Sequence, residues 1–407
     1  MNFLHKKVIR CIILFTGFTL HLQAQVPDSA YTNMLRIHKP NMVAAHPLGL
    51  LLYRINHRFN SEPVSNTTVQ IDLGSANIWL PEVRGYLPQD PQAVDHLSSF
   101  PWHQRDSVFQ GMPRNYDSMV FRADGVIKTI QLQAHFRISR KLELSVGMRN
   151  FLLTGGSDPT TLLTGDGFIE SFHEHVAGGT DPFARKQYGL NQAEIYYQGP
   201  DGTPVHFQKG NFVVAGITTD LIYYPDFNLF KQHCIYLQTG MHLGLNTTAY
   251  NRGIDAGISV GVFKQYPVGK ANTLSVAVAV SLMRQHLFDL NATADFIEGK
   301  NLPTTEWLFS YRKTLNRYRF WELGLDFYYL GPYNPLSSFD QITPVGNRLS
   351  SHWHMALTHL YRSSQNWSVF FAFGKKWTWM VYINEDFKVN NAPDIQTGLA
   401  LEIPLKL

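Results

Sequence analysis

The sequence contains little cysteine, and this limits how the chain can be stabilised. Only two cysteines occur in 407 residues. Cys11 lies in an N-terminal stretch that we expect to be removed, so the mature chain keeps Cys234 alone and cannot form an intramolecular disulfide. A mature chain of this length must then be held by a large core or by a bilayer.

Charged residues are also scarce, and long apolar runs are absent after the first residues. Asp, Glu, Lys and Arg together make up 16%, against about 25% in ordinary soluble proteins. Aromatic residues reach 13%, yet the mean hydropathy is slightly negative because polar residues interleave with apolar ones. This combination is typical of strands that face lipid on one side and water on the other. No basic patch indicates a nucleic-acid partner.

The first 24 residues have the pattern of an export signal. Three basic residues, the last of them Arg10, precede the apolar stretch 11–22, and Ala24 supplies a small residue for cleavage. The alternative is an uncleaved N-terminal anchor, although the apolar stretch is short for a spanning helix, which needs about 20 residues. We therefore predict a signal peptide over residues 1–24.

Alternation of apolar and polar residues is the main structural signal. It runs through residues 128–139 and again through 142–149, and it separates two faces as a β-strand does. Only Ser139, Arg140 and Lys141 lie between, so the two segments predict a hairpin. Further alternating segments cover 67–73, 213–223, 235–245, 254–263, 274–282, 307–313, 320–329, 353–361, 367–373 (which can continue to 383) and 399–407.

The connections between these segments alternate in length. Long ones cover 75–125, 154–211, 284–304, 331–351 and 384–393, whereas short ones include 140, 226–231, 267–272, 315–318 and 363–366. Short periplasmic turns and long extracellular loops give this pattern in outer-membrane barrels. We predict an all-β fold, an antiparallel transmembrane β-barrel of 12–14 strands over residues 66–407, with a short loop helix.

Residues 25–65 do not fit this count simply. Residues 51–59 alternate as well, and a thirteenth strand would prevent antiparallel closure. We expect either an N-terminal periplasmic extension, or a first strand with a further partner that brings the total to fourteen.

Two stretches carry a resemblance to a known family. They are Asp166–His173, followed by Arg185 and Lys186, and Ser75–Trp79. Both are similar to segments of an uncharacterised domain-of-unknown-function family of predicted outer-membrane β-barrel proteins. The resemblance covers most of the mature chain, and it implies a barrel without a known activity.

The polar face of the predicted strands supplies the expected lumen lining. These residues are Gln131, Gln133, His135, Arg137, Glu143, Arg149, His352 and His354. In an extended strand, the last two would share a face at the start of the predicted segment 353–361, where they could bind metal or titrate near neutral pH. Because no third ligand is fixed by spacing, we interpret them as lining and predict no metal site.

The predicted loop helix over 167–176 holds two of the weak catalytic candidates, Glu170 and His173, and the third, Asp166, immediately precedes it. Glu170 and His173 share a helix face, where they could bind a divalent cation or form an acid–base pair. The simpler interpretation is an amphipathic helix whose Phe168, Ile169 and Phe172 pack into the barrel mouth. Neither a His-Glu-x-x-His nor a Gly-x-Ser-x-Gly motif occurs, so enzymatic activity stays undecided, with a non-enzyme favoured.

The sequence therefore favours a pore for small solutes in the bacterial outer membrane. The alternatives are a membrane-embedded hydrolase of lipid or peptide, and a surface-binding or assembly barrel that uses loops 75–125 and 154–211. We expect a monomer without cofactors. The expected partners are outer-membrane lipid, lipopolysaccharide and the barrel-assembly machinery, without nucleic acid.

Overall fold

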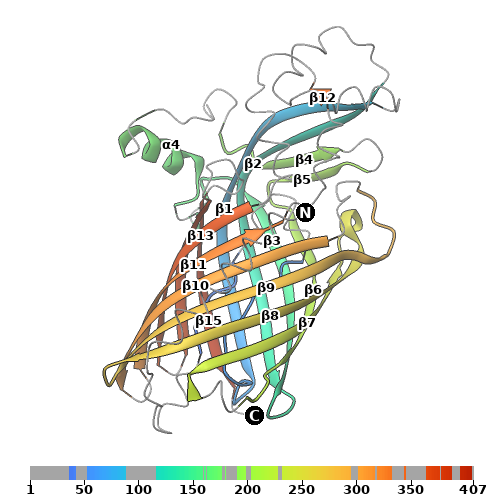
Figure 1. The fold of residues 1–407 in the computed structure, drawn as a ribbon. Coiled ribbons are helices and arrows are strands. Elements are labelled where there is room, and N and C mark those ends of the chain that lie inside the picture. The colour runs from blue at the N-terminus through green and yellow to red at the C-terminus, as the bar shows by residue number, and fades with distance from the viewer. Residues whose placement is uncertain are drawn as a thin grey trace, which may run out of the picture.

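The computed structural model is a closed antiparallel β-barrel of twelve strands, which confirms the predicted fold and count (Figure 1). The structure describes residues 36–42, 53–88, 116–158, 160–161, 163–176, 179, 190–198, 203–227, 232–294, 301–316, 319–331, 343–344, 364–375, 377–386 and 395–405. The predicted signal peptide lies outside them. The ring closes because β2 pairs with β1. In order around the wall, the strands are β1 (Thr68–Pro88), β15 (Ile395–Pro404), β14 (Thr378–Asp386), β13 (Ser364–Gly374), β11 (Arg319–Leu330), β10 (Asn301–Asn316), β9 (Asn272–Asp289), β8 (Gly253–Val268), β7 (Ile235–Asn246), β6 (Phe212–Tyr223), β3 (Leu142–Thr154) and β2 (Tyr116–Arg137).

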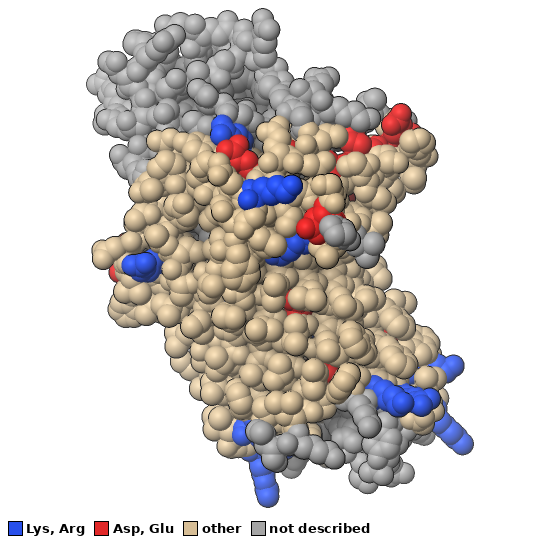
Figure 2. All heavy atoms as spheres, turned by 180° about the vertical axis from the view of Figure 1, so that it is seen from behind, with Lys and Arg blue, Asp and Glu red and all other residues tan. Residues whose placement is uncertain are grey.

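The alternation in the sequence becomes two faces of the wall. On β3, Glu143 and Ser145 are buried toward the interior, whereas Val146 and Met148 are exposed on the outside. The same division holds around the ring, so the outer surface is apolar. Large outward side chains include Leu132, Ile217, Met241, Leu243, Ile258, Val280, Leu282, Phe309, Leu323, Phe371, Val381 and Leu399. Figure 2 shows few charged side chains on the wall between the two ends of the barrel.

Aromatic side chains mark both ends of the outer surface. Tyr223, Trp377 and Trp379 are exposed near the short turns, and Tyr329 is exposed where β11 approaches its long connection. Not every clustered aromatic points outward, because the neighbouring Tyr224 and Tyr328 are buried. Aromatic rings at two levels are typical of the interfaces of a barrel that spans a membrane.

One part of the strand assignment is corrected near the C-terminus. The alternation over 367–383 is divided between β13 and β14, which are joined by a turn in which Lys375 N–H bonds the Trp377 carbonyl at 2.9 Å. The predicted turn at 363–366 is wrong, since β13 begins at Ser364. So short a turn barely interrupts the alternation, which hides it in the sequence. The predicted strand 353–361 lies outside the described residues.

The long connections carry structure that projects beyond the barrel. The predicted loop 75–125 is partly wrong, because β1 and β2 continue together as far as the Pro88–Tyr116 pair. This ribbon is extended by β4 (Glu194–Gln198), β5 (Val205–Gln208) and β12 (Thr343–Pro344) at the long-loop end (Figure 1). The predicted loop helix is confirmed as α4 (Asp166–His175), and a short 3-10 helix covers Ala249–Asn251. Among the described residues, no helix is both long and apolar enough to cross a membrane.

Candidate functional site

The barrel interior contains part of the chain that precedes β1. We call residues 36–42 and 53–65 the N-terminal segment. Ile37, Met42, Ile55 and Phe59 of this segment are all at most 3% exposed, and Phe59 packs at 6.4 Å between ring centroids on Phe263 of the wall. The lumen is therefore filled at this level by the chain itself.

The N-terminal segment is extended but is not a barrel strand. Its described part has a single isolated bridge, Arg36 with Asn60, and it joins no wall strand. The prediction of a first strand over 51–59 is therefore wrong for its described residues. The alternation arises because one side of the extended segment is buried more deeply than the other, and this needs no ladder partner.

Basic side chains of the segment meet acidic side chains of the wall. Glu306 on β10 binds Lys39, and its other oxygen lies 2.8 Å from Nδ1 of His57. Asp326 on β11 also lies 3.5 Å from the Lys39 ammonium. These carboxylates and Lys39 are almost completely buried, so the segment and the wall neutralise each other's charge out of contact with water.

A second ionic contact lies between β10 and β11. Arg312 binds Glu322 at 2.6 Å, and Arg312 also donates to the backbone carbonyl of Arg36 at 2.6 Å. The backbone N–H of His38 donates to Glu322 at 3.2 Å. Arg312 and Glu322 therefore hold the main chain of the segment as well as each other.

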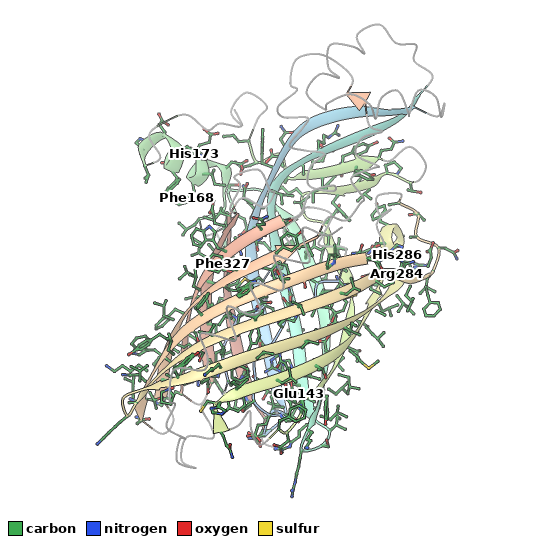
Figure 3. All side chains as sticks on the ribbon, in the orientation of Figure 1. Glu143, Phe168, His173, Arg284, His286 and Phe327 are labelled. Atoms are coloured by element: carbon green, nitrogen blue, oxygen red, sulfur yellow. The ribbon has the colours of Figure 1, made fainter. Side chains whose placement is uncertain are left out.

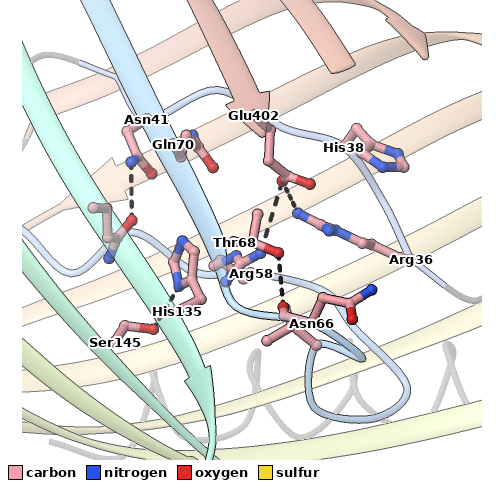
Figure 4. Close-up of polar contacts among 12 residues, drawn as sticks. Arg36, His38, Asn41, Arg58, Asn66, Thr68, Gln70, His135, Ser145 and Glu402 are labelled. Atoms are coloured by element: carbon pink, nitrogen blue, oxygen red, sulfur yellow. Dashed lines mark hydrogen bonds and ion pairs between the residues drawn. The ribbon is translucent and has the colours of Figure 1, made fainter. Parts of the chain in front are cut away.

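The carboxylate of Glu402, on the last strand β15, contacts two arginines of the segment. Figure 4 shows Arg36 and Arg58 converging on this carboxylate, with the Arg58 contact at 3.9 Å. Arg58 also donates to Glu143 on β3 at 2.9 Å, and the other Glu143 oxygen accepts from the backbone of Val64 at 2.8 Å. Arg58 thus connects β15 with β3, which are separated by β1 and β2 in the ring.

Hydrogen bonds from uncharged groups of the segment complete the attachment. The backbone and side-chain amides of Asn41 donate to the two oxygens of Asp72 at 2.9 and 3.0 Å, and its side chain also reaches Gln133 at 3.1 Å. Ser368 on β13 contacts the sulfur of Met42 at 2.8 Å. Side chains from at least six wall strands therefore contact the segment.

Two glycines shape the wall around the segment. A Cβ on Gly244 of β7 would lie 2.6 Å from the ring of Tyr53, and one on Gly257 of β8 would lie 3.0 Å from Ile55. The hydroxyl of Tyr53 in turn donates to Asp220 on β6. The wall is thus complementary to the segment in shape as well as in charge.

We expect Gly244→Val to displace Tyr53 and destabilise the protein by about 1–3 kcal/mol, the usual cost of overpacking. Thermal unfolding in detergent measures the effect. Gly167→Val is the control, because a Cβ there meets nothing within 4 Å, and a change of about 0.5 kcal/mol or less is expected. Equal unfolding temperatures for the two variants would show that Tyr53 does not need the space at Gly244.

A polar cavity remains beside the segment. It is lined by Arg54 and Asn56 of the segment and by Gln131, Arg149 and Asp220 of the wall, among others. Arg149 donates to Asn246 at 2.7 Å, and its guanidinium lies 5.7 Å from the Tyr53 ring. The cavity offers charged and amide groups of the kind that bind small polar solutes.

The structure places the predicted lumen-lining residues as follows. Gln131, Gln133 and Arg149 line the cavity. Glu143 and His135 are fully buried, His135 lies 2.7 Å from Ser145, and Figure 4 includes this pair. Arg137 is exposed at the end of β2, where it donates to the Ser139 carbonyl at 3.3 Å. His352 and His354 lie outside the described residues.

The three catalytic candidates on α4 do not converge. Asp166 is buried and accepts hydrogen bonds from Asn77 at 2.9 Å and from the Asn191 backbone at 2.8 Å, so it anchors the helix. Figure 3 shows His173 and Phe168 on α4, at the long-loop end. Ser171 contacts His175 rather than His173, at 3.4 Å. Within the ranges that the structure describes, no group of three or more His, Cys, Asp or Glu could hold a metal ion.

The packing expected for α4 is only partly found. Ile169 is 6% exposed, but Phe168 and Phe172 are 39% and 46% exposed. The two rings stack on each other at 6.3 Å instead of entering the barrel mouth. The mouth is instead bordered by the β1–β2 ribbon and the strands that extend it. There Glu194 of β4 contacts Arg122 of β2 at 2.9 Å and His206 of β5 at 2.8 Å. The hydrogen bond from Arg122 lowers the pKa of the Glu194 carboxyl.

The contact between the segment and the wall was not predicted from the sequence. The available signal was charge on the inward face: Glu322, Asp326 and Glu402 alternate with outward apolar residues in predicted strands. Buried carboxylates need cations, and Arg36, Lys39 and Arg58 lie just before the barrel. The pairing of particular acids with particular bases depends on the three-dimensional fold.

Comparisons with known proteins give structural similarities alone. No protein-family model and no curated protein matches the sequence, so the family resemblance of the two sequence stretches stays a prediction. The chain is similar to the COG4313 outer membrane channel from Pseudomonas putida F1, with 9% identity, a TM-score of 0.36, and coverage of 85% of this chain and 98% of that one. It is also similar to LpxR from Salmonella typhimurium (7%, TM-score 0.39, coverage 83% and 100%) and to the NanC porin (6%, TM-score 0.33, coverage 69% and 94%).

Proposed function

We propose that this chain is a bacterial outer-membrane channel for small polar solutes, and that its N-terminal segment holds the lumen closed. The apolar outer surface with aromatic residues at both ends supports placement in a membrane. The polar cavity lined by Arg54, Arg149 and Asp220 supports a polar solute.

The main support for this proposal is the kind of contact that holds the N-terminal segment in the barrel. Its contacts with the wall are ion pairs, side-chain hydrogen bonds and apolar packing, without a backbone ladder to any strand. The barrel ring closes between β1 and β2 without it. The segment can therefore leave while every wall strand keeps its backbone partners, and its charged groups gain water in exchange for their ion pairs.

A disulfide lock tests the proposal. A Cβ on Gly244 would lie 2.9 Å from the Cβ of Tyr53, and small adjustments bring this to the 3.5–4.5 Å that a disulfide needs. The protein Tyr53→Cys/Gly244→Cys, made with Cys234→Ser, is expected to stay closed in planar bilayers when oxidised and to open under applied voltage when reduced.

The matched control is Tyr53→Cys with Cys234→Ser, whose conductance should not respond to reductant. Equal conductance of the double-cysteine protein in both redox states, with the disulfide verified by mass spectrometry, would contradict a gating role for the segment. A barrel that conducts in neither state under any voltage would reject the channel itself.

A further inference from the structure

Three inward side chains on neighbouring strands form a continuous hydrogen-bonded row. Nδ1 of His242 on β7 lies 2.7 Å from a carboxylate oxygen of Asp220 on β6. Nε2 of the same ring lies 2.7 Å from Oγ of Ser259 on β8. The antiparallel registers of β6 with β7 and of β7 with β8 create this row.

The order of the three groups determines which nitrogen of the His242 imidazole carries the proton. An ionised carboxylate can only accept, so Nδ1 carries the proton that bonds to Asp220. In the neutral ring, Nε2 then has a free lone pair and accepts the hydroxyl proton of Ser259. This is the arrangement in which an imidazole removes a proton from an attacking serine.

We propose that Ser259 is a nucleophile for acyl transfer from carboxylic esters that enter the lumen. Ser259 Oγ attacks the ester carbonyl carbon while its proton passes to Nε2 of His242. The tetrahedral intermediate then breaks its bond to the ester oxygen, and this oxygen takes the proton from His242 and departs as the alcohol. Ser259 is left as an acyl-serine. Water attacks this ester in the same way, releasing the carboxylic acid and restoring the hydroxyl of Ser259. Asp220 positions the ring and stabilises its charged form.

The local packing favours a reactive pair. A Cβ on Gly240, which lies opposite Ser259 in the ladder, would be 2.6 Å from both Nε2 of His242 and Oγ of Ser259. Any larger residue at position 240 would therefore separate the two groups. Another lumen pair, His135 with Ser145, has a similar distance of 2.7 Å. There Ser145 contacts Nδ1, and the Glu143 carboxylate lies 3.8 Å from that same nitrogen. The acid and the serine therefore do not lie on opposite nitrogens of the ring, as they do at His242.

The N-terminal segment covers the triad. Tyr53 donates to Asp220, and Ile55 packs near Gly257, which is two residues from Ser259. Ser259 and His242 are 9% and 3% exposed. The geometry of the triad is independent of the proposed channel, whereas access of an ester to it rests on the proposed displacement of the segment.

A fluorophosphonate probe, which forms a covalent bond with activated serines, tests the inference in the full-length protein in detergent. Labelling is measured in the Glu306→Gln protein, in which the segment is loosened. We expect the label at Ser259 by peptide mass spectrometry, and none there after Ser259→Ala. His242→Ala should slow labelling roughly 10²–10⁴-fold, the usual contribution of a general base. Asp220→Asn should change the pH profile of labelling.

Ser145→Ala in the same background is the control, and its labelling should be unchanged because that serine lacks the arrangement found at His242. Absence of label in a Glu306→Gln protein that conducts would show that Ser259 is not a nucleophile, without contradicting the proposed channel. Label at Ser259 in a protein that never conducts would support the nucleophile and reject the channel.

Discussion

Replacing Glu306 by Gln is expected to raise the open probability of the channel roughly a hundredfold or more. Glu306 is the carboxylate that binds both Lys39 and His57, and all three groups are buried. Breaking a buried pair by removing one charge costs about 3–5 kcal/mol, because the other charge stays buried. Each 1.36 kcal/mol changes a population ratio about tenfold. Lys39 keeps Asp326 at 3.5 Å, so we expect the lower part of this range.

Single-channel recording in planar bilayers measures the open probability. Glu62→Gln is the matched control, since it removes a carboxylate from the same segment at an exposed position, and exposed charges contribute little. The closed state would not depend on the Glu306 ion pairs if the two variants opened equally often. Thermal unfolding of both proteins distinguishes opening from general loss of structure.

Deletion of residues 36–65 is expected to give a barrel that conducts continuously and selects cations. The segment supplies Arg36, Lys39 and Arg58, and without them Glu143, Glu306 and Glu402 face an open lumen. Rings of carboxylates favour cations in a pore. The reversal potential in a salt gradient measures the selectivity, and constant current at low voltage measures the loss of gating.

Two comparisons make this result specific. In the deletion protein, Glu306→Gln with Glu402→Gln should move the reversal potential toward zero, because two of the exposed carboxylates are gone. Folding of the deletion protein is checked by its heat-dependent gel migration. A folded deletion protein that stays closed, or that prefers anions, would contradict the role given to the segment.

The sequence by itself determined the two faces of the wall, and it limited the number of strands to between twelve and fourteen. Alternation such as that of Val146 and Met148 with Ser145 and Glu143 reports that neighbouring side chains meet different surroundings. It also located the β2–β3 hairpin around Arg140 and the helix that begins at Asp166. These features depend on residues close together in the chain, so a local pattern is sufficient to find them.

The tertiary structure alone decided what fills the barrel and which polar groups meet inside it. Residues 53–59 alternate just as a wall strand does, yet they lie extended in the lumen, because alternation records surroundings and does not record backbone partners. The row of Asp220, His242 and Ser259 depends on the register between strands, since a shift of one residue would turn a side chain to the outer face. Register is set by pairing around the whole ring, and no single segment contains it.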